Sequence, residues 1–140
     1  EVVGVGLRAK DVATDMDLAW AATVVNKDVN EVGRIVDEMI SAAEEFFGEL
    51  PKELTYVHAL AETETMWLEF PFADGKVMIK YHSDGTYSAE YVPDTWWKHL
   101  LGSDDPRDRI VRVRGKSAAR EAISELTAAL RLASIERPGA

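Results

Sequence analysis

The chain has 140 residues, no cysteine and a formal net charge of −9 at pH 7. Its hydrophobic fraction of 46% and charged fraction of 29% are typical of one globular domain with its own core, and they exclude a disordered chain. The lack of cysteine excludes disulfides, thiolate metal sites and a thiol nucleophile, and it favours a cytoplasmic location. No run approaches the ~20 apolar residues of a membrane span and no segment resembles a signal peptide, so we expect no membrane partner.

The charge is unevenly distributed along the chain. Residues 1–70 carry 15 acidic and 5 basic side chains, whereas residues 71–140 carry 10 acidic and 11 basic ones. A solvated acidic helix face beside a nearly neutral sheet explains this pattern most simply. An acidic surface that meets a basic partner is the alternative. The overall negative charge argues against general binding to nucleic acid.

The first two segments of the chain, residues 2–9 and 12–25, differ in how clearly they predict a secondary structure. Residues 2–9, rich in valine and glycine, favour a strand. Residues 12–25 are ambiguous, because their apolar side chains fit a helical spacing and a strand alternation equally well. The β-branched ending of this segment tips the prediction toward a hairpin with residues 2–9.

The pattern at residues 29–47 predicts an amphipathic helix. Asp28 is placed to cap it, with Glu31 three residues later as a capping-box partner, and Gly48 and Pro51 end it. The apolar positions form one wide stripe typical of a helix packed on a sheet: Val29, Val32, Val36, Met39, Ile40, Ala43, Phe46 and Phe47.

From residue 54 to residue 92 the apolar period changes to two, which predicts a meander of antiparallel strands. A two-residue Asp-Gly turn at residues 74–75 would place Phe70 opposite Ile79 and Glu69 opposite Lys80. A three-residue loop at residues 83–85 would place Ile79 opposite Ala89. Both loops keep apolar side chains on one face of the sheet.

The last third predicts a short helical turn at residues 93–102, a strand at residues 107–114 and a final amphipathic helix capped by Ser117. Together, these elements predict a single α+β domain over residues 1–140. In it, two amphipathic helices pack on one face of an antiparallel sheet made of the meander and the strands at residues 2–9 and 107–114.

This strand facing predicts one candidate binding surface on the sheet face away from the helices. Trp67, Glu69, Lys80 and His82 would lie there, with Trp67 opposite His82. A large aromatic, a histidine and an ion pair are typical of a binding patch. The simpler interpretation is that Trp67 only covers the face and that Glu69 and Lys80 form an ordinary cross-strand pair.

Two further features qualify as candidate binding elements. Trp96 and Trp97 lie together in the predicted helical turn, where one exposed tryptophan would serve as an interface anchor, or both would cover the end of the sheet. Arg112 and Arg114 would point outward from the 107–114 strand and are suited to holding carboxylate or phosphate. The basic run to which they belong, residues 107–120, lacks interleaved aromatics, so pairing with the protein's own acids is the favoured interpretation.

The sequence predicts no metal site, no cofactor and no catalytic residue. His58, His82 and His99 show no ligand spacing, and no serine, phosphate-loop or zinc-protease motif is present. The parity of the loop after His58 would decide whether this side chain faces the core or the open side of the sheet.

Two functional hypotheses follow. The first is a non-enzymatic interaction or accessory domain, such as an inhibitor, immunity protein or chaperone, that binds a partner protein through its exposed sheet face and tryptophan turn. The second is a small-molecule-binding domain or weakly marked enzyme, with a pocket between sheet and helices lined by tyrosines and His58. Nucleic-acid binding through the arginine run is a weaker third, and homodimer formation is left open.

Overall fold

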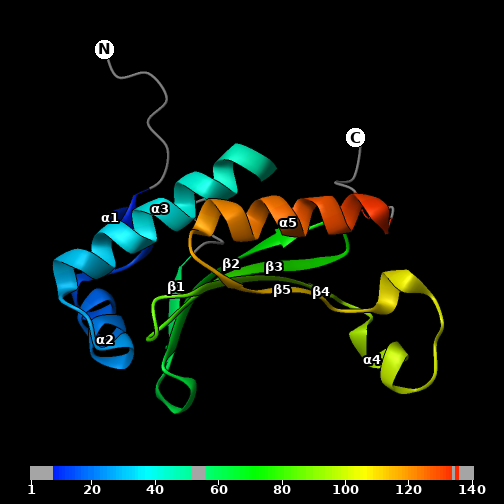
Figure 1. Ribbon diagram of the computed structural model, residues 1–140, viewed down its shortest axis with the longest axis horizontal. Helices are drawn as coiled ribbons and strands as arrows, with labels where there is room; N and C mark the ends of the chain where they lie inside the picture. Colours follow the sequence, from blue (N-terminus) through cyan, green and yellow to red (C-terminus); the bar gives the residue numbers. More distant parts are fainter. Residues whose placement is uncertain (1–7, 52–55, 134, 136–140) are drawn as a thin grey trace.

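A computed structural model describes residues 8–51, 56–133 and 135. Its centre is a five-stranded antiparallel sheet in which the strands follow one another in chain order, β1-β2-β3-β4-β5 (Figure 1). The strands are β1 (Val57–Leu60), β2 (Thr65–Phe72), β3 (Gly75–His82), β4 (Tyr87–Pro93) and β5 (Val111–Lys116). Sheet order therefore places β1 at one edge and β5 at the other.

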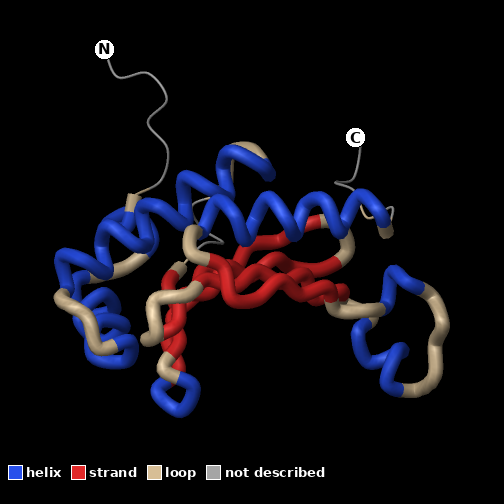
Figure 2. The backbone as a smooth tube through the Cα atoms, viewed as in Figure 1, coloured by secondary structure: helices blue, strands red, loops and turns tan. Residues whose placement is uncertain are grey.

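The helices gather mainly on one face of the sheet. The long helices α3 (Val29–Phe47) and α5 (Ala119–Leu132) cover this face, as Figure 2 shows. The short helix α1 (Ala9–Val12) packs on α3, and α2 (Asp15–Val25) packs on β1 and β2. The remaining helical segments, at turns, are η2 (Ala61–Thr63), α4 (Trp96–Leu100) and η3 (Pro106–Asp108). The predicted α+β fold, with two amphipathic helices on one face of an antiparallel sheet, is confirmed.

Helix α3 spans the predicted residues, and its stripe lies against the sheet. Val32, Val36, Met39 and Ile40 are almost completely buried. The Asp28 carboxylate accepts a hydrogen bond from the Asn30 N–H at 2.8 Å and caps the first turn, as predicted. Its final turn contributes Phe47 to the core, where it makes edge-to-face ring contacts with aromatic side chains of β2.

The preference for a strand at residues 12–25 was wrong, because residues 15–25 form helix α2. Thr14 and Asp17 start it as a reciprocal capping box: the Thr14 hydroxyl accepts from the Asp17 N–H at 3.1 Å, and the Asp17 carboxylate accepts from the Thr14 N–H at 3.2 Å. The buried side is not the one that the large side chains suggested, since Met16 is 83% exposed and Trp20 is 53% exposed.

The predicted N-terminal strand falls mostly outside the described residues, which begin at Arg8. The described end of that segment is not a strand, because Ala9 already belongs to helix α1. Asp37 of α3 accepts a hydrogen bond from the Ala9 N–H at 2.7 Å, which fixes α1 on α3.

The register between β2 and β3 differs by two residues from the prediction. Phe70 pairs with Val77 and not with Ile79, and Glu69 pairs with Met78 and not with Lys80. The turn residues are Ala73, which takes a φ of 50°, and Asp74. Gly75 already belongs to β3, where a Cβ would lie 2.3 Å from the Val92 carbonyl oxygen, so glycine permits the close approach of β4. Because side chains alternate between the two faces of a strand, a register shift of two residues leaves each side chain of β2 and β3 on its predicted face.

The three-residue loop at residues 83–85 is confirmed. Tyr81 pairs with Tyr87 and Ile79 with Ala89, and Gly85 takes the expected positive φ, of 90°. This loop fixes which side chains of β3 and β4 share a face.

The last strand and helix begin later than predicted. Asp105 caps the helical turn η3 by accepting a hydrogen bond from the Arg107 N–H, so β5 starts only at Val111. Helix α5 is capped at Ala118 without a side-chain hydrogen bond, so the prediction of Ser117 as the cap was wrong. Helix α4 begins and ends within the predicted turn.

The described helices and strands surround one hydrophobic core. Its largest fully buried side chains come from α3, α5, the end of α2 and the helix-facing side of β2 and β3. Within the described ranges, no helix combines the length and the apolar character needed to cross a bilayer.

Candidate functional site

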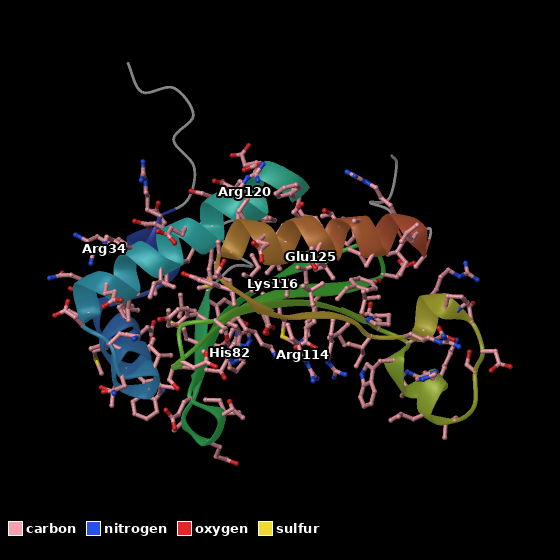
Figure 3. The ribbon with its side chains drawn as sticks, viewed as in Figure 1. Arg34, His82, Arg114, Lys116, Arg120 and Glu125 are labelled. Carbon is pink, nitrogen blue, oxygen red and sulfur yellow. The ribbon has the colours of Figure 1, made fainter. Side chains whose placement is uncertain are left out.

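The sheet face opposite α3 and α5, called the open face below, carries the predicted polar side chains. In β2, Met66, Leu68 and Phe70 are buried against the helices, whereas Trp67 and Glu69 between them are only half-buried. In β3 the same alternation places Lys80 and His82 on the open face. Figure 3 shows His82 and Arg114 on the side of the sheet away from α5. The predicted facing of these strands is therefore confirmed.

Glu90 is the most deeply placed charge on the open face. It is 7% exposed and pairs across the sheet with Met78 on one side and Arg112 on the other. Lys80 Nζ contacts one carboxylate oxygen of Glu90, and Arg112 Nε lies 3.2 Å from the other. The predicted Glu69–Lys80 pair is wrong, because the β2–β3 register places Met78 opposite Glu69, and Lys80 contacts Glu90 of β4 instead.

Trp67 is held between polar and aromatic neighbours. The His58 ring stacks on it with a centroid distance of 5.3 Å and an interplanar angle of 12°. The indole N–H donates a hydrogen bond to Glu69 Oε2 at 3.0 Å, and Lys76 Nζ lies 3.6 Å from Glu69 Oε1. His58 thus faces the open side, paired with Trp67, because an even number of residues, 61–64, connects β1 to β2. The predicted pairing of Trp67 with His82 was wrong, since Lys80 lies opposite Trp67.

The hydrogen bonds around His82 define its tautomer. The Thr65 hydroxyl donates its one proton to the Thr63 carbonyl at 2.9 Å, so at 3.3 Å it accepts from His82 Nδ1–H. The other ring nitrogen, Nε2, lies 2.8 Å from Ser88 Oγ and accepts the serine proton. Burial lowers the pKa of His82 from 6.5, Asp84 opposes this effect, and Lys80 adds to it. The neutral form of His82 is therefore favoured.

One hollow of about 650 Å³ on the open face, called the open-face hollow below, is lined by Trp67, Lys80, His82, Ser88, Glu90 and Arg112, but not by Glu69 or His58. Trp67 of β2 and Arg114 of β5 lie toward opposite sides, with Lys80, His82 and Ser88 between them in the sheet order. The charged residues that line it are three cations and two carboxylates: Lys80, Arg112, Arg114, Asp84 and Glu90. With His82 neutral, the hollow has an excess of one positive charge on a chain of net charge −9.

Arg114 is the cation with the most freedom in this hollow. It is exposed and makes no hydrogen bond or ion pair with any residue in the described part of the chain. The neighbouring Gly115 has a φ of 69°, at an irregularity in the pairing of β4 with β5 opposite Ser88. This bulge leaves the Arg114 side chain beside the hollow, where its guanidinium can contact an anionic group.

Most of the other bases in the predicted run pair with the protein's own acids. Arg107 pairs with Asp105 at 2.9 Å, and both Lys116 with Glu125 and Arg120 with Glu45 at 2.7 Å. Lys116 and Glu125 join β5 to α5, as their positions in Figure 3 indicate. Arg114 is the exception on β5.

The tryptophan turn is separate from the open-face hollow. Trp96 and Trp97 are 43% and 48% exposed, and Leu100 and Leu101 are more exposed still. Helix α4 contacts η3, where Asp108 accepts hydrogen bonds from Thr95 and Ser103. These bonds lower the pKa of Asp108. The structure therefore presents a second, apolar surface at α4, away from α2 at the other end of the molecule (Figure 1).

Of the four tyrosines predicted to line a pocket under the helices, only Tyr56 lies beside His58. Tyr81, Tyr87 and Tyr91 are buried in the core, and the rings of Tyr81 and Tyr87 pack edge to face at 5.1 Å. Tyr56 is half-exposed, and its ring lies 4.5 Å from that of His58. The predicted position of a small-molecule pocket was wrong in this respect.

Two features of the site were missed by sequence reasoning. One is the Thr65–His82–Ser88 hydrogen-bond chain, and the other is the pair of cations on Glu90. The Thr65–His82 contact required the correct β2–β3 register, and the contacts of Ser88 with His82 and of Lys80 with Glu90 are diagonal ones between β3 and β4. Within the described residues, no group of three histidine, aspartate or glutamate side chains is arranged to hold a metal ion.

Comparison with known proteins adds no assignment: no family matches the chain, and no curated protein or solved structure matches it either.

Proposed function

We propose that this protein is a non-enzymatic interaction or accessory domain, of the inhibitor, immunity or chaperone kind, that binds an acidic segment of a partner protein. The binding surface is the open-face hollow, including Arg112 and Arg114 of β5. The observation that carries the proposal is that three strands, β2, β3 and β5, bring Trp67, Lys80, Arg112 and Arg114 to one hollow with excess positive charge. The absence of cysteine supports a cytoplasmic setting as part of the same proposal.

The chemistry of the hollow fits protein recognition. Tryptophan and arginine are the residues most enriched among those that dominate binding energy, and Trp67 and Arg114 lie toward opposite sides of the hollow. Lys80 and Arg112 both contact the Glu90 carboxylate, whereas the Arg114 side chain has no such partner among the described residues. An acidic side chain of the partner supplies a counter-charge for Arg114. Its attraction to the positive hollow directs the partner to this part of a chain whose net charge is negative.

The apolar surface at α4 is the second contact in this proposal. Trp96, Trp97, Leu100 and Leu101 expose large apolar area on one short helix, and the same partner covers part of it. The proposed partner is a protein and not a nucleic acid, because the net charge of the chain is −9.

The test is selection from a displayed library of random peptides on the full chain, followed by affinity measurements of the retained peptides on the wild type and on the Arg114→Glu variant. We expect the retained peptides to be enriched in aspartate and glutamate, and to bind Arg114→Glu about tenfold or more weakly. Arg34→Glu, the same charge change at an exposed site on α3, is the matched control and should bind as the wild type does. Retained peptides without acidic enrichment, or equal loss in both variants, contradict the proposal.

A hydrolase is the second candidate, favoured by one observation. The Ser88 hydroxyl donates to His82 Nε2, and Thr65 orients the other ring nitrogen, which is the arrangement of an activated nucleophile and its base. In such a reaction Ser88 Oγ attacks an ester carbonyl carbon while its proton passes to His82. The protonated His82 then gives that proton to the leaving alkoxide, and water releases the acyl group.

This second candidate is tested with p-nitrophenyl acetate and the full chain. Hydrolysis that disappears in both Ser88→Ala and His82→Gln but persists in Ser103→Ala supports it. Hydrolysis that is unchanged in Ser88→Ala contradicts it and attributes the activity to general surface catalysis.

A further inference from the structure

Strand β5 forms an edge of the sheet with one side unpaired. It pairs with β4 only, and no strand among the described residues pairs with its other side. None of its six residues is buried, whereas most residues of β4 are. At the opposite edge, β1 is packed against α2. The outer edge of β5 therefore presents backbone N–H and C=O groups to which another strand can bond.

The side chains of β5 give this edge a definite character. Arg112 lies on the open face opposite Glu90, and Arg114 lines the open-face hollow. Val111 and Val113 pair with the buried residues Tyr91 and Ala89, so they face the α5 side and are half-buried. The edge thus alternates cations on one face with apolar side chains on the other.

The same pattern disfavours pairing of β5 with a second copy of itself. Antiparallel pairing of two such strands brings arginine close to arginine across the new pair, which is repulsive. The bulge at residues 114–115 also ends the regular edge, because Gly115 takes a positive φ. The edge is protected from self-association but not from a strand of opposite charge.

We propose that the outer edge of β5, from Val111 to Arg114, accepts an added strand from the partner protein, and that this strand alternates acidic and apolar side chains. This inference rests on the proposed function, since it specifies how the acidic segment reaches the open-face hollow. The acidic side chains meet Arg112 and Arg114 on the open face, and the apolar ones extend the layer of Val111 and Val113 beside α5. Backbone hydrogen bonds supply the binding, and alternate side chains supply the selectivity.

The experiment uses the full chain and two synthetic peptides of equal composition, the alternating Glu-Val-Glu-Val-Glu-Val and the block Val-Val-Val-Glu-Glu-Glu. Binding is measured by NMR titration, and hydrogen exchange of the β5 amides is measured with and without each peptide. We expect saturable binding of the alternating peptide, about tenfold or more tighter than that of the block peptide. We also expect slowed exchange at alternate amides between Val111 and Arg114.

The variant Arg114→Glu should weaken binding of the alternating peptide about tenfold or more, and Arg34→Glu should leave it unchanged. Because the exposed Arg114 side chain makes no hydrogen bond or ion pair within the described chain, its replacement leaves the folded core intact, which the amide spectrum checks. The alternating peptide of opposite charge, Lys-Val-Lys-Val-Lys-Val, should not bind the edge, because its lysines repel Arg112 and Arg114.

Three results overturn the inference. They are equal binding of the two acidic peptides, no saturable binding of the alternating one, and unchanged exchange of the β5 amides in the bound state. In the third case, peptide-induced shifts confined to the open-face hollow reject strand addition but leave the proposed function standing. If neither these peptides nor those selected from the library perturb the open face, the proposed function fails as well.

Discussion

Glu90 and Arg112 face each other across β4 and β5, with Arg112 Nε 3.2 Å from Glu90 Oε2. Lys80 occupies the other carboxylate oxygen, so one buried acid organises two cations from neighbouring strands. The contact holds Arg112 of β5 against Glu90 of β4 inside the open-face hollow. It therefore links the stability of the sheet to the charge of the proposed binding surface.

The Glu90→Gln variant should lower the free energy of unfolding by about 1–3 kcal/mol, because two cations lose a buried partner. The lower end of this range applies if water screens Lys80 and Arg112, which are partly exposed. Urea unfolding is the measurement. Glu45→Gln, which removes the exposed partner of Arg120, is the control and should change stability by about 0–1 kcal/mol. Equal effects of both variants would show that Glu90 is not a structural centre.

Gly75 and Gly33 should respond in opposite ways to alanine. A Cβ at Gly75 would lie 2.3 Å from the Val92 carbonyl oxygen and 2.7 Å from Pro93 Cα, so Gly75→Ala must separate β3 from β4. We expect a loss of about 1–3 kcal/mol or more. A Cβ at Gly33 meets nothing within 4 Å, so Gly33→Ala in α3 should add about 0.5–1 kcal/mol. Thermal unfolding of the two variants checks both signs, and a stable Gly75→Ala would contradict the register.

Stability should depend on the protonation of His82. Burial places its pKa below 6.5 in the folded state, so the unfolded chain binds more protons in this range. The contribution of neutral His82 is thus present above pH 6.5 and is lost as the pH falls through the lowered value. Unfolding free energies measured from about pH 8 to about pH 5 should fall less steeply in His82→Gln than in the wild type. Identical slopes would mean that His82 is not desolvated.

The two tryptophan sites should separate stability from binding. Trp67 stacks on His58 and donates to Glu69, so Trp67→Ala should lower the unfolding free energy by about 1–3 kcal/mol. Trp97 is nearly half-exposed, and Trp97→Ala should change it by less than about 1 kcal/mol. Chemical denaturation followed by circular dichroism gives both values. A larger loss for Trp97→Ala would indicate that α4 is a structural cover and not a contact surface.

The strongest sequence patterns predicted the elements that position the site. Helix α3 has one wide apolar stripe and a capping residue, Asp28, so its limits could be predicted. The loop at residues 83–85 could be predicted because only one loop length kept Ile79 opposite an apolar side chain, Ala89. Since this loop defines which face each side chain of β3 and β4 occupies, the residues of these strands on the open face could be predicted as well.

Other features could not be predicted because tertiary contacts decide them. Helix α2 buries Ala21 and Ala22 and exposes Met16 and Trp20, so the size of its side chains indicated the wrong side. The Asp-Gly pair at residues 74–75 resembled a turn, but Gly75 is required by its close approach to β4. The resulting two-residue shift kept the facing of β2 and β3 correct but changed each partner between these two strands. The contact of Thr65 with His82 depends on those partners.

The most direct test of the account is a map of backbone amide shifts on the full chain, titrated with an acidic peptide retained by the library. We expect the shifts to concentrate on the open face, at Trp67, Lys80, Ser88 and Arg114, and to vanish in Arg114→Glu. Shifts that concentrate instead on the outer sides of α3 and α5, with the open face unperturbed, would contradict it.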